Sequence, residues 1–181
     1  MFEINSKVEI EILGYFFLNQ NARNYINELA KILECNPANL DKKLKELEEE
    51  GVLESKKRGN QKYYFLNKKY PLLKEVKKIF EVKYGLREQL RKELNKIPDI
   101  KEAYIFGSFA KGKFKNKSDI DLLLIGSHSS IDTIRTLSKI QKTRQREINI
   151  INMTQKDFLQ KKKKHDEFLE NIFDNQVIKV I

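Results

Sequence analysis

Apolar residues recur at helical spacing through the first third of the chain, and polar residues mark where the helices begin. Ser6 and Glu9 form a capping-box pattern ahead of an apolar face, which predicts a first helix that ends near Leu18. Apolar positions spaced by three and four within residues 24–34 predict a short second helix. The chain is therefore expected to open with a small, mostly helical domain.

A third helix is bounded by residues that start and stop helices. Asn36 is the expected N-cap, Pro37 takes the first helical position and Gly51 lies just past the end. Its buried face is expected to consist of leucines, namely Leu40, Leu44 and Leu47. Two strand-like runs, residues 52–57 and 62–67, then flank the turn sequence RGNQ, which predicts a two-stranded hairpin.

This order of three helices and a hairpin resembles the small winged-helix domains of bacterial and archaeal transcription regulators. The resemblance rests on residues 6–67 and predicts a winged-helix domain over residues 1–69. It implies that the third helix enters the major groove of double-stranded DNA and that the hairpin contacts the backbone or minor groove. The implied contacts are polar residues of that helix and hairpin: Asn39, Lys42, Lys43, Lys45, Lys56, Lys57, Arg58 and Gln61. Because the helix ends in ELEEE, protein contacts or dimerisation are the alternative use of the domain.

Residues 70–97 have the pattern of an amphipathic helical connector. Its apolar positions recur at spacings of three and four: Leu72, Val76, Ile79, Val82, Leu86, Leu90, Leu94 and Ile97. Gly85 predicts a bend or a break between two helices. The apolar stripe is expected to pack on both domains or on a second copy of itself, which leaves a homodimer open.

The last part of the chain alternates short apolar runs with helical segments. The predicted strands are residues 102–107, 118–125, 147–153 and 177–181. The predicted helices are residues 131–144 and a longer segment from Thr154 to about Phe173, with Thr154 and Asp157 as its cap. This pattern predicts an α+β domain with a mixed sheet over residues 98–181.

Composition adds a partner and a compartment to this picture. The formal net charge of +10 indicates an anionic partner, and residues 101–181 hold 16 Lys and Arg against 10 Asp and Glu. A single cysteine, Cys35, excludes an internal disulfide and a cysteine-based metal cluster. No apolar run approaches the roughly 20 residues that span a bilayer. A cytoplasmic protein without a membrane partner is therefore expected.

Two acidic residues stand close together at the start of the second predicted strand. Asp119 and Asp121 precede the apolar run 122–125, and residues two apart in a strand point to the same face. Neighbouring carboxylates repel each other and strands disfavour aspartate, so the pair needs a compensating partner. A divalent cation is the expected partner.

The segments GSFAKG and SDIDLLL together resemble the nucleotidyltransferase superfamily that includes DNA polymerase beta, in particular its minimal bacterial and archaeal members. The family pattern is Gly-Ser, two residues, a basic residue and Gly, followed after a short spacer by Ser-Asp-apolar-Asp-apolar. The resemblance covers residues 98–181. The matching positions are Gly107, Ser108, Lys111, Gly112, Ser118, Asp119, Ile120, Asp121 and Leu122.

The resemblance implies a task for each matched residue. Gly107 lets the backbone approach a phosphate, and Ser108 offers an amide and a hydroxyl donor. Asp119 and Asp121 are implied to hold Mg²⁺ for an NTP substrate, with ATP as the expected nucleotide. The implied nucleotide-binding residues are Gly107, Ser108, Lys111, Gly112 and Ser118, with Lys113 as a further cation.

One position departs from the family pattern. The family has a third carboxylate on a neighbouring strand, which serves as metal ligand and as base, and the best register places Asn149 there. Glu147 lies two residues earlier on the same strand face and is the expected substitute because of its longer reach. An amide cannot take a proton as a base does. The candidate catalytic residues are Asp119, Asp121, Glu147 and Asn149.

Two functions follow from these patterns. In the first, the chain is a Mg²⁺-dependent nucleotidyltransferase that moves a nucleoside monophosphate from an NTP to a hydroxyl of a protein or small molecule. In the second, it is a DNA-binding regulator or antitoxin-like protein whose impaired transferase-like domain senses a nucleotide or a partner. The third acidic position separates them, because a productive Glu147 favours the enzyme and an unassisted Asn149 favours the sensor.

Overall fold

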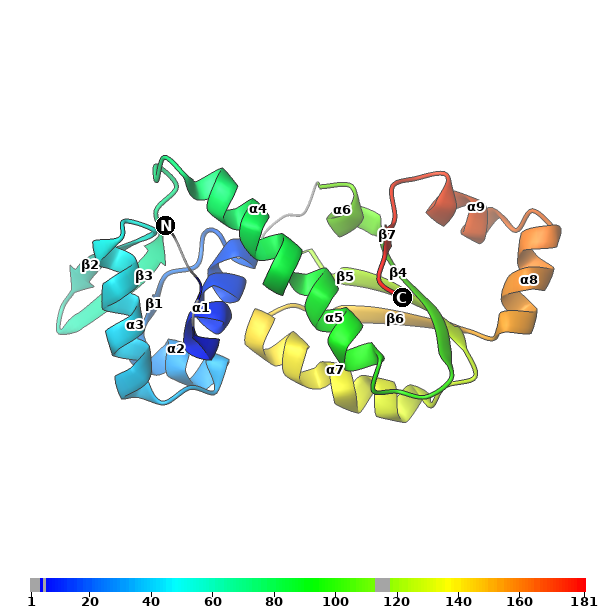
Figure 1. Cartoon of the computed structure of the whole chain (residues 1–181), viewed down its shortest axis with the longest axis horizontal. Coiled ribbons are helices and arrows are strands. Elements are labelled where there is room, and N and C mark those ends of the chain that lie inside the picture. Colours follow the sequence, from blue (N-terminus) through cyan, green and yellow to red (C-terminus); the bar gives the residue numbers. More distant parts are fainter. Residues whose placement is uncertain (1–3, 5, 113–117) are drawn as a thin grey trace. The chain divides into compact units, whose positions relative to one another are not determined.

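The computed structural model describes residues 4, 6–112 and 118–181 of the chain. The chain divides into two compact units, Met1–Leu86 with Lys142–Gln145 and Arg87–Gln141 with Arg146–Ile181. Figure 1 labels the elements of both, and each unit is described separately below. In the part of the chain that the structure describes, no helix is both long and apolar enough to cross a membrane.

The first unit begins with three helices, and the first and third of them have the N-caps that the sequence predicts. The Ser6 side chain accepts a hydrogen bond from the amide of Glu9, and the Asn36 side chain accepts one from the amide of Ala38. Both caps satisfy amides that a helix start leaves without a partner. The elements are α1 (Lys7–Leu18), β1 (Asn24–Tyr25), α2 (Ile26–Leu33), α3 (Pro37–Glu49), β2 (Leu53–Arg58), β3 (Gln61–Leu66) and α4 (Leu73–Tyr84).

The sheet of the first unit has three strands in the order β1-β3-β2, whereas the sequence predicts a two-stranded hairpin. The additional strand β1 pairs with β3 through Asn24↔Tyr64 and Tyr25↔Tyr63. Its two residues are too few to give a recognisable alternation of polar and apolar positions. The strand is recognised only by its pairing with the edge of β3. The hairpin prediction was therefore incomplete by one strand.

The core of the first unit joins the helices to one face of this sheet. Leu40, Leu44 and Leu47 of α3 are buried, as their spacing predicts. In α4, Val76 and Phe80 join the same core, whereas Ile79 is 51% and Val82 is 75% exposed. Of the stripe predicted for the connector, Val76 therefore joins the core of this unit, whereas Ile79 and Val82 lie outside it.

The second unit is an α/β domain built on one four-stranded mixed sheet. The strand order is β6-β5-β4-β7, with β5 and β6 parallel and the other pairs antiparallel. The mixed sheet predicted from the sequence is therefore present. The elements are α5 (Leu86–Leu94), β4 (Ile100–Phe106), α6 (Gly107–Ala110), β5 (Ile120–Gly126), α7 (Ser130–Arg144), β6 (Ile148–Met153), α8 (Gln155–Lys163), α9 (Glu167–Phe173) and β7 (Ile178–Lys179).

Alternation along β5 separates the two faces of this sheet. Leu123 and Ile125 pack with Phe158 of α8 and with Leu169 and Ile172 of α9. Asp121 belongs to the same face, since it lies two residues before Leu123. The helices α8 and α9 therefore cover Leu123 and Ile125, and Asp121 on the same face is half-exposed.

Two boundaries differ from the sequence-based prediction. The strand expected from Ser118 begins at Ile120, whose amide donates to the Glu147 carbonyl at 2.9 Å in the first pair of the parallel ladder. The single helix expected over residues 154–173 is two helices, because the Asp166 side chain caps α9 and pairs with Lys161 at 2.6 Å. The chain reverses between α8 and α9 through a left-handed residue, His165, at φ 53°.

Candidate functional site

The turn between β4 and α6 lies directly against Asp121. Gly107 has a φ of +72°, a conformation that favours glycine, and it starts the single-turn helix α6. A Cβ atom at this position would lie 2.2 Å from Oδ2 of Asp121. Glycine is therefore required both by the backbone and by the approach of the carboxylate. The glycine-serine turn and the second aspartate of the sequence motif form one local structure.

The paired strands bring an amide beside the same carboxylate. Asp121 is aligned with Phe106 of β4 on one side and with Asn149 of β6 on the other. The Asn149 Nδ2 donates to Oδ1 of Asp121 at 3.3 Å. Asn149 is thus the residue that the fold places next to Asp121 on the neighbouring strand.

The two remaining acids stand at the same end of the sheet. Asp119 and Glu147 each lie just before the pair Ile120↔Ile148, which opens the parallel ladder of β5 and β6. Both residues are exposed. Asp119 therefore belongs to the segment that leads into β5, and only Asp121 lies within the strand. The prediction that both aspartates lie on one face of a strand was wrong for this reason.

The other candidate nucleotide-binding residues lie around α6 and before β5. Ser108 is half-buried in α6, and the Lys111 amide closes its turn by donating to the Gly107 carbonyl at 3.2 Å. Gly112 follows at φ +65°, and no described atom lies within 4 Å of the position that a Cβ would take there. Ser118 is half-buried next to Asp119. Lys113 lies outside the described residues.

An aromatic pair adjoins the site, and the sequence analysis did not assign it. Phe106, the last residue of β4, meets Phe168 of α9 edge-on with 6.5 Å between the ring centroids. Phe168 is 39% exposed although it is large and apolar. Only the packing of α9 places it near the Gly107 turn, because more than 60 residues separate the two rings in the sequence.

The donor set of this site fits a hard divalent cation. Two carboxylates, Asp119 and Asp121, and the amide oxygen of Asn149 are oxygen ligands of the type that Mg²⁺ takes. Among the described residues, no group of three or more His, Cys, Asp or Glu side chains is gathered closely enough to hold a metal by itself.

The lysines of α3 differ in what they contact. Lys43 pairs with Glu46 and, at 3.6 Å, with Glu9, and the hydrogen bond to Glu46 raises the pKa of Lys43 above its usual value. Lys45 pairs with Asp41 at 2.7 Å, and this hydrogen bond raises the pKa of Lys45. Lys42 is exposed and takes no part in these ion pairs. It is therefore the lysine of α3 best placed to meet an external phosphate.

The hairpin carries the remaining candidate DNA contacts. Arg58 pairs with Gln61 across the two-residue turn, and Gly59 in that turn has a φ of +58°. The Tyr63 hydroxyl donates to Oε1 of Gln61 at 2.8 Å. The three cations of β2, Lys56, Lys57 and Arg58, are exposed. Asn39 in the first turn of α3 is exposed as well.

Replacing Gly107 with alanine tests the contact between the turn and Asp121. The substitution adds positive-φ strain of about 1 kcal/mol and displaces the Asp121 carboxylate. We expect a modest fall in melting temperature and a much larger loss of Mg²⁺-dependent NTP affinity in calorimetry. Gly59→Ala is the matched control, since Gly59 has a similar φ of +58° and no described atom within 4 Å of its Cβ position. Equal NTP binding by both variants would contradict the assigned geometry.

Comparison with known proteins identifies the family of this part of the chain. Residues 88–178 match the family described as "Polymerase beta, Nucleotidyltransferase", which is 91 of the 181 residues. The chain belongs to this nucleotidyltransferase family. The crystal structure of a proposed nucleotidyltransferase from Sulfolobus solfataricus is 23% identical, with a TM-score of 0.29, and covers 41% of this chain and 68% of its own. No curated protein sequence matches the chain.

Proposed function

We propose that the chain is a Mg²⁺-dependent nucleotidyltransferase that moves a nucleoside monophosphate from an NTP, with ATP as the expected one, to a hydroxyl acceptor. The observation that carries this proposal is the contact of the Gly107 turn with Asp121. A phosphate-binding turn and a metal-binding carboxylate have to meet at one point for a metal–nucleotide complex to bind. Family membership supports the same reaction class.

Positioning and charge account for most of the proposed catalysis. Ser108 and the backbone of the Gly107 turn bind the phosphates, and Lys111 neutralises part of their charge. Asp119 and Asp121 would hold Mg²⁺, which when bound neutralises charge on the transferring phosphoryl group. Glu147 acts as the general base, because an amide cannot accept the proton of the attacking hydroxyl.

A second function is favoured by the hydrogen bond between Asn149 and Asp121. The Asn149 amide donates to Asp121 at 3.3 Å, and the family resemblance implies a third carboxylate at the position of Asn149. In this alternative the domain binds nucleotide without turnover and reports the nucleotide to a partner or to DNA. Labelled-nucleotide transfer into a lysate, measured beside calorimetric NTP binding, separates the two. Binding with transfer supports the enzyme, and binding without transfer supports the sensor.

We propose that the first unit is a winged-helix domain that binds double-stranded DNA. Its order of helices and hairpin supports this, with α3 as the helix for the major groove and β2–β3 as the wing. Exposed cations on both elements, Lys42 on α3 and Lys57 and Arg58 on β2, supply phosphate contacts. Asn39 is the candidate for a base edge.

Alanine in place of Lys42 or Arg58 should weaken duplex binding across all sequences, because each removes a phosphate contact. Each should also reduce the slope of log affinity against log salt by about 0.9, measured by fluorescence anisotropy between about 50 and 200 mM salt. Lys43→Ala should have a smaller effect, since Lys43 is paired with Glu46 and Glu9. An intact protein that binds no duplex even at low salt would leave only a role in protein contacts.

A further inference from the structure

The sheet of the first unit presents two chemically different faces. The hydroxyl of Ser55 and the amine of Lys62 both bond to Glu48 of α3, so the face that carries Ser55, Lys62 and Tyr64 lies against α3. The intervening residues of β2 and β3 point the other way. We call this second surface the outer face, and its residues are Glu54, Lys56, Arg58, Gln61, Tyr63 and Phe65, with Tyr25 of β1 opposite Tyr63.

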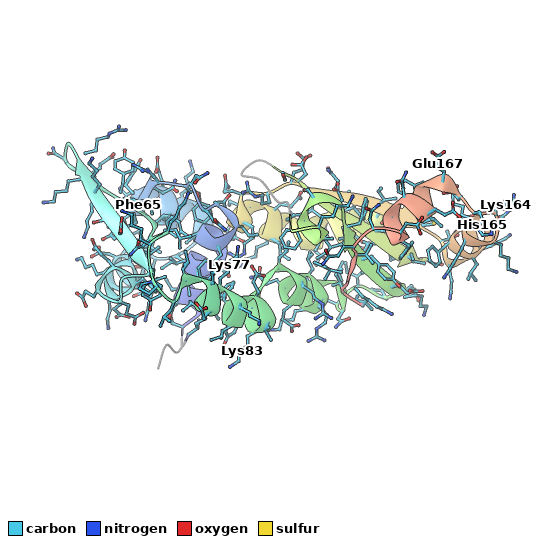
Figure 2. All side chains as sticks on the ribbon, turned by 90° about the horizontal axis from the view of Figure 1, so that it is seen from above. Phe65, Lys77, Lys83, Lys164, His165 and Glu167 are labelled. Carbon is cyan, nitrogen blue, oxygen red and sulfur yellow. The ribbon has the colours of Figure 1, made fainter. Side chains whose placement is uncertain are left out.

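Aromatic rings lie in a row on this outer face. Tyr25 and Tyr63 meet edge-on, with 5.7 Å between the ring centroids. The Arg23 guanidinium lies over the Phe65 ring, 4.8 Å from its centroid. Tyr63 and Phe65 are half-buried rather than covered by a helix. Phe65 is labelled beside the hairpin in Figure 2.

Two hollows of the outer face meet at Arg23 and Phe65. One, of about 290 Å³, extends toward the hairpin turn, and the other, of about 300 Å³, extends toward the residues after β3. Six cations line them: Arg23, Lys56, Lys57, Arg58, Lys68 and Lys69. Of the described residues that line them, one, Glu54, carries a carboxylate. The lining of the two hollows is therefore strongly cationic. The N-terminal 70 residues as a whole are nearly neutral, with 12 Lys and Arg against 11 Asp and Glu.

We propose that the outer face binds single-stranded nucleic acid. Its cations follow the phosphate backbone, while unpaired bases stack on Tyr63 and on the planar Arg23 guanidinium over Phe65. A duplex hides the flat faces of its bases, so a row of aromatic rings on an exposed sheet has little use against double-stranded DNA. The combination of rings and cations distinguishes this surface from α3, whose candidate DNA contacts are Asn39 and lysines.

The proposal concerns a different face of the first unit from the α3 surface and does not depend on duplex binding or on the transferase site. The two surfaces share the cations of the hairpin, so variants of those cations do not separate them. Tyr63 and Arg23 on the outer face, and Lys42 on α3, are specific to one surface each.

The test uses the full chain and a fluorescent oligothymidylate of about 12 nucleotides, within the usual range of single-strand sites. We expect Tyr63→Ala and Arg23→Gln each to weaken its binding about tenfold in anisotropy titrations. Lys42→Gln, a matched removal of one positive charge, should leave it unchanged. Tyrosine fluorescence should be quenched on binding, since the chain has seven tyrosines and no tryptophan.

Salt dependence separates stacking from charge. Arg23→Gln should lower the salt slope, whereas Tyr63→Ala should lower affinity at every salt concentration without changing the slope. Arg23 is exposed, so Arg23→Gln should leave the fold intact. The Arg23 variant therefore still tests the proposal if Tyr63→Ala unfolds the sheet. Single-strand binding that is absent at low salt, or that is equal in the wild type and both outer-face variants, overturns the proposal. All of these variants should keep Mg²⁺-dependent NTP binding, because that binding depends on the proposed transferase site and not on the outer face. Loss of NTP binding would therefore contradict the proposed function and not the single-strand proposal.

Discussion

Asp121→Ala should abolish Mg²⁺-dependent NTP binding, with a loss of roughly a hundredfold or more in affinity measured by calorimetry. Loss of a partner in the outer shell of a metal site already costs about 10–100-fold, and Asp121 is a direct candidate ligand. Its carboxylate also adjoins the Gly107 turn, so the variant loses the point at which metal and phosphates meet. The double variant with Asp119→Ala should show no measurable binding.

Asp132→Asn is the control for this experiment. Asp132 is an exposed acid in the first turn of α7, so the variant removes the same charge from a helix surface away from the Gly107 turn. It should bind NTP as the wild type does. Unchanged NTP binding by Asp121→Ala, in a protein with a wild-type melting curve, would falsify the nucleotide site.

Asn149→Asp should raise nucleotide transfer by about tenfold or more, because it restores a ligand and a potential base beside Asp121. The new carboxylate replaces an amide that donates to Asp121 at 3.3 Å. Two carboxylates at that distance repel each other unless a cation lies between them. The variant should therefore melt at a lower temperature than the wild type without Mg²⁺ and recover when Mg²⁺ is added.

Asn152→Asp provides a matched charge on the opposite face of β6. Asn152 lies three residues beyond Asn149 and contacts His128 and Ser130 instead of Asp121. Its variant should show neither the gain in transfer nor the rescue by Mg²⁺. If Asn149→Asp abolishes transfer instead of raising it, Asn149 is not at the position of the third acid.

Glu147→Gln completes this comparison. We expect the wild type to transfer nucleotide weakly. If Glu147 is its base, this transfer is lost in Glu147→Gln and returns in the double variant that also carries Asn149→Asp. Labelled-nucleotide transfer measures all three proteins under one condition. Transfer that is indifferent to Glu147 removes it from the mechanism, and absence of transfer in every variant with NTP binding intact favours the sensor.

The local structure of this chain was determined by short stretches of sequence. The caps at Ser6 and Asn36 and the proline at the first position of α3 act within one helical turn, so they predict the helix starts directly. The apolar run after Asp121 predicts β5 for a similar reason, since alternation and burial along one strand need no distant partner. Gly107 was identified through the resemblance of GSFAKG and SDIDLLL to the nucleotidyltransferase pattern, and in the structure it starts the short helix α6.

Tertiary structure decided which of these pieces meet. Two-residue β1 exists because β3 offers an edge, and its pairing brings Tyr25 to Tyr63 on the outer face. In α4, the side chains of the core select Phe80 over Ile79, although both fit an apolar stripe. Each choice depends on contacts between segments far apart in the chain, which a local pattern cannot specify.

The candidate site divides along the same line. The sequence by itself determined that two aspartates follow a glycine-serine turn, whereas the predicted strand face shared by Glu147 and Asn149 is not formed, because β6 begins at Ile148. The apolar pattern of β6 predicted Asn149 at the position of the third carboxylate, and the parallel register of β5 and β6 aligns Asn149 with Asp121. A slip of one residue in that register would turn the whole strand over, so the hydrophobic residues of both sheet faces fix it. The sequence of β6 thus indicated which residue takes the third position, and packing across the sheet brought its amide to 3.3 Å from Asp121.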